Sequence, residues 1–318
     1  MRAASTDPRA CDGTLSASRG VIARCARRCA PCARKALGLR RPLAALAVLA
    51  ATWVHAGEVL RESIRSERLG RDVAFTVYLP EEARGPARKD MLVIYLLHGA
   101  GGDESSWVQH GKPVVPLSSA MRDGTMRPAI LVMPSLGPQN WWIDGAVDAA
   151  ATAFVTEVMT QIEARLQIDG KRRTRAIAGV SMGGFGALHL ALKHPQLFCA
   201  AALISPAVYE PVPPAHSAAR RSAQFARGGS FDAGLWAASN HPAQLATYRE
   251  SPDKVAFWIV SGDHDELGIA SSSVQLFERL HAIQPDRTEL RISDGGHDGP
   301  TFDRALPGAL QFIDQRCR

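Results

Sequence analysis

Ser181 is the residue of this sequence whose surroundings most favour covalent chemistry. It lies at the centre of Gly179-Val180-Ser181-Met182-Gly183, which fits the G-x-S-x-G pattern of a serine exposed on a sharp turn between a strand and a helix. Glycines on both sides of the turn remove the Cβ atoms that would collide where strand and helix cross. Apolar residues at 176–180 predict the strand, and those at 184–191 predict the helix. This context predicts a serine nucleophile rather than an incidental serine at a glycine-rich helix start.

A serine hydroxyl needs a base that takes its proton, and the base needs a carboxylate that orients it. In sites with this turn, the acid and then the histidine follow the serine along the chain, each after a strand. His297 meets the requirement for the base. It follows the predicted strand Glu289–Ile292, lies between glycines at 296 and 299, and precedes a predicted helix.

Three carboxylates are candidates for the acid, because all of them follow the predicted strand Val255–Val260: Asp263, Asp265 and Glu266. We favour Asp265, since two residues separate it from the glycine that ends the strand. Asp263 is the alternative, although it could instead cap the loop.

The negative oxygen that forms during acyl transfer needs backbone N–H donors near the serine. Met182, the residue after the nucleophile, is expected to supply one of them. The loop His98-Gly99-Ala100-Gly101-Gly102 follows a buried strand and is expected to supply the second, from Ala100 or alternatively from Gly101. His98 is expected to order this loop. A nucleotide-binding loop would need a lysine or an acidic ribose partner, and neither is present.

Four residues near these loops are candidates for contact with a substrate: Gly99, Trp107, Trp141 and Trp142. The adjacent pair Trp141 and Trp142 follows a predicted strand, and rings at a pocket rim would stack on a sugar or an aromatic group. The alternative is that one ring packs inward while the other is partly exposed. We expect no metal and no organic cofactor, because a serine, a base and an acid need neither.

Residues 57–318 alternate strands with helices, which predicts one α/β catalytic domain with a mainly parallel sheet and helices on both faces. The ranges Glu58–Ser66 and Asp72–Leu79 predict a hairpin. A helix is expected over Asp148–Leu166, with Asp148 as its N-cap. Residues 205–253 lack a clear strand and fall between two strands of the sheet, so we expect a cap or long loop over the active-site edge.

Residues 1–56 differ in character from the rest of the chain. They hold ten Lys or Arg and two Asp, whereas the remaining residues are close to neutral, so no nucleic-acid partner is expected. The apolar run Pro42–Ala56 follows two arginines and ends in small residues, which is typical of a signal peptide and too short to span a bilayer. We therefore expect a basic leader and signal peptide over 1–56, a mature protein without a membrane span, and a periplasmic or secreted location.

Four of the six cysteines lie in this leader, and the body keeps only Cys199 and Cys317. Cys199 lies in an apolar strand and is expected to be a core residue. We therefore expect an exported domain without a disulfide framework.

The body resembles the esterase D family of α/β-hydrolases, a family that includes feruloyl and acetyl xylan esterases, S-formylglutathione hydrolases and mycolyltransferases. The matching motifs span almost all of residues 58–318: Val77–Pro80, Leu96–Gly102 with Trp107, Ala178–Ala187, Gly262–Asp265 and Gly296–Asp298. The resemblance implies the α/β-hydrolase fold, a triad of Ser181, Asp265 and His297, and an oxyanion hole formed by the amides of Ala100 and Met182.

Together these features predict an exported serine esterase that acts through an acyl-enzyme on a small-molecule or polysaccharide-linked ester. One alternative is an acyltransferase, mycolyltransferase-like, which moves the acyl group to a sugar or lipid hydroxyl. Another is a binding protein without catalytic activity on the same scaffold. The retained Ser181, Asp265 and His297 argue against the binding protein. The sequence does not indicate an oligomeric state.

Overall fold

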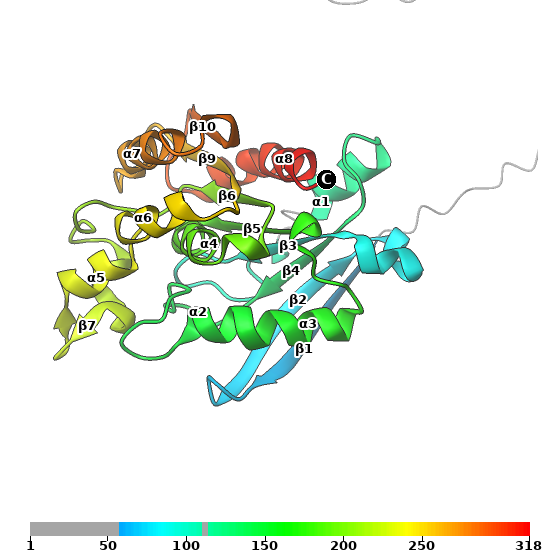
Figure 1. The fold of residues 1–318 in the computed structure, drawn as a ribbon, viewed down its shortest axis with the longest axis horizontal. Coiled ribbons are helices and arrows are strands. Elements are labelled where there is room, and N and C mark those ends of the chain that lie inside the picture. The colour runs from blue at the N-terminus through cyan, green and yellow to red at the C-terminus, as the bar shows by residue number, and fades with distance from the viewer. Residues whose placement is uncertain (1–56, 110–113) are drawn as a thin grey trace, which may run out of the picture. The chain divides into compact units, whose positions relative to one another are not determined.

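An eight-stranded sheet runs through the described part of the chain, which in this computed structural model comprises residues 57–109 and 114–318. The predicted leader and signal peptide lie outside the described residues. The strand order is β1-β2-β4-β3-β5-β6-β9-β10, with the β1–β2 hairpin at one edge and β10 at the other (Figure 1). The strands are β1 Glu58–Ser66, β2 Arg71–Leu79, β3 Leu92–Leu97, β4 Ala129–Pro134, β5 Arg175–Val180, β6 Ala200–Ile204, β9 Ala256–Gly262 and β10 Thr288–Ser293.

The sheet is mainly parallel, as predicted. Every pair from β4 through β3, β5, β6 and β9 to β10 is parallel, whereas β2 is antiparallel to both β1 and β4. All six residues of β3 and of β4 are buried, which explains their unbroken apolar sequence. Because the carboxyl ends of parallel strands meet at one edge, the loops after β3, β5, β6, β9 and β10 gather there.

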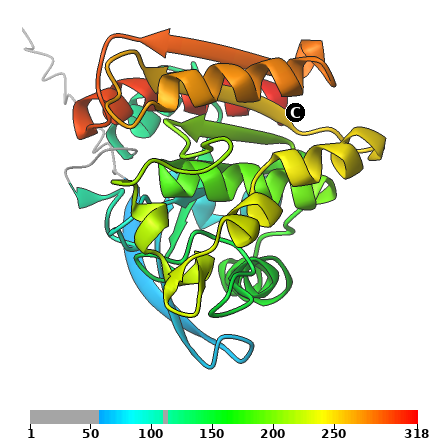
Figure 2. The same cartoon turned by 90° about the vertical axis from the view of Figure 1, so that its left-hand side faces the viewer.

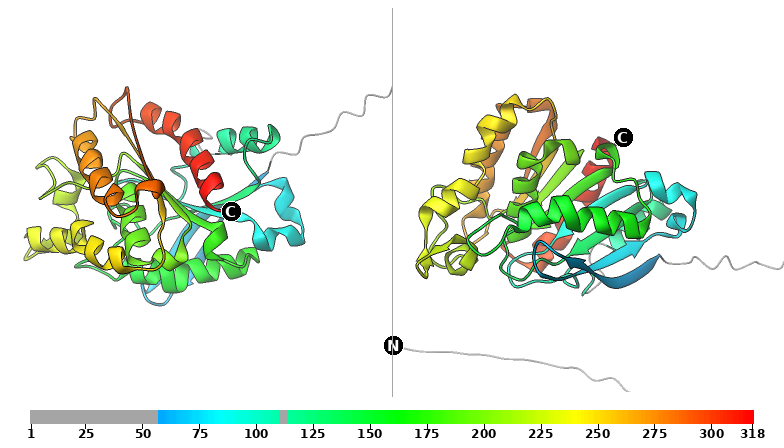
Figure 3. Two further views of the ribbon diagram at one scale, coloured as in Figure 1. Left: turned by 45° about the horizontal axis from the view of Figure 1, so that its top comes forward. Right: turned by 60° about the horizontal axis from the view of Figure 1, so that its bottom comes forward.

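Helices cover both faces of the sheet (Figure 2). Alternate residues of β3 face opposite ways, so Leu92 and Ile94 join a core with Leu310, whereas Val93 and Tyr95 join a core with Leu188. The α1 and α8 side faces the viewer in the left view of Figure 3, and the α3 and α4 side in the right view. The helices are α1 Val114–Arg122, α2 Ala150–Ala153, α3 Met159–Leu166, α4 Met182–Lys193, α5 Ala233–Ser239, α6 Pro242–Glu250, α7 Ile269–His281 and α8 Gly299–Arg316.

The predicted helix over 148–166 is present but begins later and is not regular. Residues Phe154–Val158 form a π-helical stretch between α2 and α3, and Ala149 occupies the N-cap position without a side-chain bond. The prediction that Asp148 is the N-cap is wrong, because its carboxylate accepts hydrogen bonds from Asn140 and Gln224 instead. The carboxylate of Asp144 reaches the first turn and accepts the backbone amide of Thr152 at 2.8 Å.

The segment 205–253 holds α5, α6 and a short antiparallel pair, β7 Ala226–Arg227 and β8 Ser230–Phe231. An aromatic cluster fixes this segment to the rest of the fold. Trp236 of α5 lies 5.2 Å from the ring of Phe185 in α4, and Trp141 lies 5.4 Å from Phe225. Such ring pairs contribute about 0.5–1.5 kcal/mol each beyond their buried area.

A disulfide joins Cys199, at the start of β6, to Cys317, directly after α8, with 5.2 Å between their Cα atoms. The expectation of a body without disulfides is therefore wrong. Cys199 and Cys317 are both buried, and the bond ties the C-terminus of the chain to the centre of the sheet.

Within the described part of the chain, no helix combines the length and the apolar character needed to cross a bilayer.

Candidate active site

Ser181 occupies the turn between β5 and α4 with φ 56° and ψ −115°, a conformation that L-residues rarely adopt. The flanking glycines are sterically required, as the motif predicts. A Cβ on Gly179 would collide with the Gly183 carbonyl, and a Cβ on Gly183 would collide with the carbonyls of Leu97 and His98. The turn therefore holds the serine hydroxyl above the carboxyl edge of the sheet.

A chain of hydrogen bonds joins the three residues predicted to react. The Oγ of Ser181 lies 2.9 Å from Nε2 of His297, and Nδ1 of His297 lies 2.8 Å from Oδ2 of Asp265. The Asp265 side chain is fully buried, and its Oδ1 accepts the amide of Leu267 at 3.0 Å. A buried carboxylate on Nδ1 favours the tautomer with its proton there, which leaves Nε2 free to accept the serine proton.

Packing holds the His297 ring in place. Its side chain is 13% exposed and meets the ring of Phe302 edge-on, with 5.1 Å between the ring centroids. Directly after it, Asp298 caps α8 by accepting the amide of Thr301 at 2.9 Å. His297 thus directly precedes the N-cap of α8, and the capped helix limits the movement of its loop.

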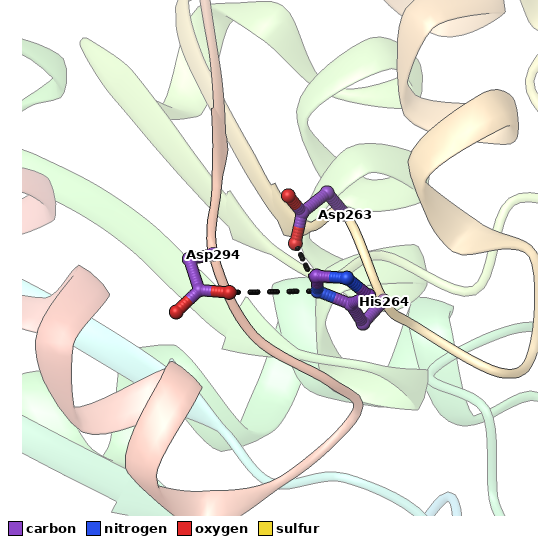
Figure 4. Close-up of side chains that lie close together, drawn as sticks. All are labelled: Asp263, His264 and Asp294. Atoms are coloured by element: carbon purple, nitrogen blue, oxygen red, sulfur yellow. Dashed lines mark ion pairs between the residues drawn. The ribbon is translucent and has the colours of Figure 1, made fainter.

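The two other candidate acids have different partners. Asp263 accepts the amide of Gly295 at 3.1 Å, and Glu266 lies 3.4 Å from the amide of His297. Asp263 also belongs, with His264 and Asp294, to an exposed group whose potential metal-ligand atoms lie within 4.8 Å of one another (Figure 4). The structure therefore places Asp265, and not Asp263, against the imidazole.

The loop after β3 lies beside the nucleophile. A Cβ on Gly99 would be 3.6 Å from the Cβ of Ser181, an ordinary van der Waals contact, so the loop lies directly against the nucleophile without requiring a glycine at this position. The amide of Gly101 donates to the Pro138 carbonyl at 2.7 Å, which removes the alternative donor. Within the described residues, the amides of Ala100 and Met182 have no protein partner. His98 is buried with its Nδ1 2.9 Å from the Gly99 carbonyl, and burial lowers the pKa of its imidazole.

The three tryptophans proposed as substrate contacts are buried. Trp141 is 1% exposed, Trp142 is fully buried and Trp107 is 5% exposed. Trp142 packs on the ring of His98 at 5.1 Å, and Trp141 lies in the aromatic cluster under segment 205–253. The expectation that at least one ring of the pair is exposed at a rim is wrong. Both α4 and segment 205–253 pack against Trp141. Trp142 instead lies against Phe154 and against Gly186 of α4.

The loop after β6 also reaches the site, which the sequence did not reveal. The amide of Ala207 donates to the Ser181 carbonyl at 3.1 Å. Burial raises the pKa of Tyr209 to about 12, and the nearby carboxylates of Asp265 and Glu266 add to the rise. A neutral phenol therefore lies near the acid of the site. The only sequence signal for a role of this loop at the site is its position directly after a strand of the sheet.

A family model and several known proteins are similar to this chain. The model of the Esterase family matches residues 66–313. The chain is 28% identical over 167 residues to an endo-1,4-beta-xylanase/feruloyl esterase of Xylanibacter ruminicola, covering 50% of this chain and 23% of that protein. It is 29% identical over 142 residues to the esterase Rv1288 of Mycobacterium tuberculosis, covering 43% of this chain and 30% of that protein. The chain thus matches less than a third of the length of these curated relatives.

Solved structures show the same fold. A ferulic acid esterase matches with a TM-score of 0.67 at 25% identity, over 81% of this chain and 98% of that chain. An S-formylglutathione hydrolase from Agrobacterium tumefaciens matches with a TM-score of 0.62 at 19% identity, over 83% of this chain and 96% of that chain. The predicted α/β-hydrolase fold and the predicted resemblance to esterases are confirmed.

Proposed function

The chain belongs to the Esterase family, and we propose that it hydrolyses carboxylic esters with Ser181 as nucleophile, His297 as base and Asp265 as the acid that orients it. The observation that carries this proposal is the continuous hydrogen-bond chain from Ser181 Oγ through both nitrogens of His297 to Asp265, with steps of 2.9 and 2.8 Å. These distances are those at which a proton passes directly between catalytic groups.

In the first half of the reaction, His297 Nε2 takes the proton of Ser181 as the serine oxygen attacks the ester carbonyl carbon. The resulting imidazolium is stabilised by the buried Asp265 carboxylate. Collapse of the tetrahedral intermediate breaks the bond to the alcohol, which leaves with the proton from His297, and the acyl group remains on Ser181. Water then repeats the sequence and releases the acid.

The oxyanion of each tetrahedral intermediate would lie against the amides of Ala100 and Met182. Gly101 is excluded as a donor because its amide is bonded to Pro138. Met182 is the first residue of α4, so the partial positive charge of the helix N-terminus adds to the stabilisation. Removing one such donor typically lowers kcat by about 10²–10³-fold.

The proposed substrate is a small-molecule or polysaccharide-linked ester. The likeness to a ferulic acid esterase and to an endo-1,4-beta-xylanase/feruloyl esterase supports hydroxycinnamoyl esters of sugars as the first class to test.

We further propose that the protein is exported. The Cys199–Cys317 disulfide supports this location, because such bonds persist in oxidising compartments and are rare in the cytosol.

The proposal is tested by hydrolysis of short-chain and long-chain p-nitrophenyl esters and of methyl ferulate, by the purified protein and by Ser181→Ala. We expect turnover by the wild type and its loss in the variant. Addition of a sugar acceptor separates hydrolysis from acyl transfer, since release of free acid should stay unchanged. Stoichiometric labelling of Ser181 by a fluorophosphonate with no ester turnover would instead favour the acyltransferase. Equal turnover by wild type and variant would refute the assignment of the nucleophile.

A further inference from the structure

The loop that carries His297 contains little side-chain packing of its own. Residues 293–297 read Ser-Asp-Gly-Gly-His, and Gly295 has φ 147°, a backbone conformation that side chains strain. A Cβ on Gly262, which ends β9, would collide with the Gly295 carbonyl, so the loops after β9 and β10 touch backbone to backbone. The position of the histidine therefore depends on hydrogen bonds between these two loops.

Besides the bond between His297 and Asp265, four hydrogen bonds join the loops. Two are between backbone groups and continue the parallel pairing of β9 with β10: the amide of Asp263 donates to the Ser293 carbonyl at 2.9 Å, and the amide of His264 donates to the Gly295 carbonyl at 2.9 Å. Two use carboxylates of the acid loop, which accept amides of the histidine loop. Asp263 accepts Gly295 at 3.1 Å, and Glu266 accepts His297 at the longer distance of 3.4 Å.

Asp263 thus binds the histidine loop through both its amide and its carboxylate. The Gly295 amide also holds the pKa of Asp263 below its usual range, which keeps the acceptor charged. The Nδ1 of His264 lies 2.8 Å from the same carboxylate oxygen, and 3.5 Å from Asp294 (Figure 4).

From this geometry we propose that Asp263 is a positioning residue. By accepting the Gly295 amide, it keeps His297 within hydrogen-bond distance of both Ser181 and Asp265. Glu266 supports the same loop through its longer hydrogen bond to the His297 amide. The inference rests on the proposed function, because it assigns a task to residues beside the proposed triad. A displacement of about 1 Å in such a site can cost on the order of 10²-fold in rate.

The same exposed group has the residue types of a metal site. Its side chains are 46%, 73% and 95% exposed for Asp263, His264 and Asp294. The Asp263 oxygen that lies beside His264 is the one that accepts the Gly295 amide, so a role within the protein accounts for its position. The two roles differ in which variants lose activity.

The test compares four variants with the wild type in ester hydrolysis: Asp263→Ala, Asp263→Asn, Glu266→Gln and, as the matched control, Asp294→Ala. For Asp263→Ala we expect kcat to fall about 10- to 100-fold with KM within twofold, because the reacting groups are displaced and the binding surface is not. Asp263→Asn should retain most of the wild-type kcat, since the amide oxygen of its side chain can still accept a hydrogen bond from the Gly295 amide. Glu266→Gln and Asp294→Ala should stay within threefold of the wild type.

Wild-type kcat in Asp263→Ala would overturn the proposal, and so would a rise in KM as large as the fall in kcat. A fall in Asp294→Ala equal to that in Asp263→Ala, with activity that EDTA removes and a divalent cation restores, would overturn it in favour of a metal site. Turnover by the wild type and its loss in Ser181→Ala keep these results separate from a failure of the proposed function.

Discussion

The strained backbone of Ser181 is held by its neighbours rather than by its own preference. Such a conformation costs on the order of 1–3 kcal/mol. The Ser181 amide donates to the Ile204 carbonyl at 2.9 Å, and its carbonyl accepts the amides of Phe185 and Ala207 at 3.0 and 3.1 Å. Three elements, β6, α4 and the loop after β6, therefore fix the residue from different sides.

A second residue with a perturbed environment is His189 of α4, which packs away from the triad. Burial lowers the pKa of His189 to about 4, and the other charged groups near it, Lys193, His194 and Asp144, act in opposite directions. Its Nδ1 lies 3.0 Å from the Ser239 carbonyl. The imidazole is thus neutral in the folded protein at pH 7, while the unfolded chain protonates it below about pH 6.5.

This difference predicts a contribution to acid sensitivity. Because the folded pKa is depressed, the stabilisation is complete above pH 6.5 and is lost as the pH falls towards 4, by about 3 kcal/mol in total. The side chain in His189→Gln cannot titrate, so the stability of this variant should decrease less as the pH is lowered. The free energy of unfolding of both proteins is measured by urea titration at pH 7 and pH 4.5. At pH 7 the wild type should be more stable than the variant, and at pH 4.5 this difference should be smaller by about 2 kcal/mol. Parallel pH profiles for the two proteins would contradict the prediction.

Among the elements, α3 is anchored to the sheet by a buried ion pair at the end of the strands opposite to the active site. Arg175 of β5 makes two hydrogen bonds to the carboxylate of Glu163, at 2.7 and 2.8 Å, and Tyr95 of β3 donates a third at 3.0 Å. The guanidinium and the carboxylate are both buried, so the charge of each compensates the desolvation cost of the other.

Removal of one charge should therefore be costly. Glu163→Gln leaves the Arg175 guanidinium buried without a counter-charge and is expected to lower the free energy of unfolding by about 3–5 kcal/mol, measured by urea titration. The matched control is Asp90→Asn, which breaks exposed pairs with Lys171 and Arg173 and should leave the unfolding midpoint unchanged. Equal midpoints for Glu163→Gln and the wild type would show that the pair does not anchor the helix.

Long, patterned elements could be predicted from the sequence, whereas features set by tertiary contacts could not. The strands β3, β4 and β5 follow from unbroken apolar runs, and the order of serine, acid and histidine follows from what comes after each strand. The burial of Trp141 depends on the rings of Phe225 and Trp236, which lie 84 and 95 residues further along the chain and pack against it. The periodicity of a local stretch of sequence does not show which distant residues pack against a side chain.

The prediction of Asp148 as N-cap is wrong for a related reason. Its position before an amphipathic run fits a cap, but Gln224 from a distant segment binds the carboxylate and Asp144 serves the helix instead. The disulfide had one signal in the sequence, namely that residues 57–318 hold an even number of cysteines, Cys199 and Cys317. Spacing alone could not show that their Cα atoms lie 5.2 Å apart.

At the scale of the whole molecule, this disulfide closes a loop that contains Asp265 and His297 of the proposed triad, whereas Ser181 precedes the loop. It joins positions 118 residues apart, and β6, α7, β10 and α8 lie between them along the chain. A loop of this length restricts the unfolded chain strongly.

Removing the bond should therefore destabilise the molecule without altering the chemistry. The double variant Cys199→Ala/Cys317→Ala is expected to lose about 2–5 kcal/mol of stability, while kcat at 25 °C stays near the wild-type value. Wild-type protein unfolded in the presence of dithiothreitol should match the variant, which serves as the control. Two free thiols in the oxidised wild-type protein under denaturing conditions would contradict the bond itself.

The central claim is that ester hydrolysis passes through an acyl group on Ser181, and mass analysis of the protein during turnover tests it most directly. Protein mixed with p-nitrophenyl acetate is quenched in acid, digested and mapped, beside Ser181→Ala treated identically. We expect one acetyl group, located on the peptide that contains Ser181 and absent from the variant. The turnover rate of the variant should be at least about 10³-fold below that of the wild type. Turnover by the wild type without acetylation of that peptide, or an undiminished rate in Ser181→Ala, would contradict it.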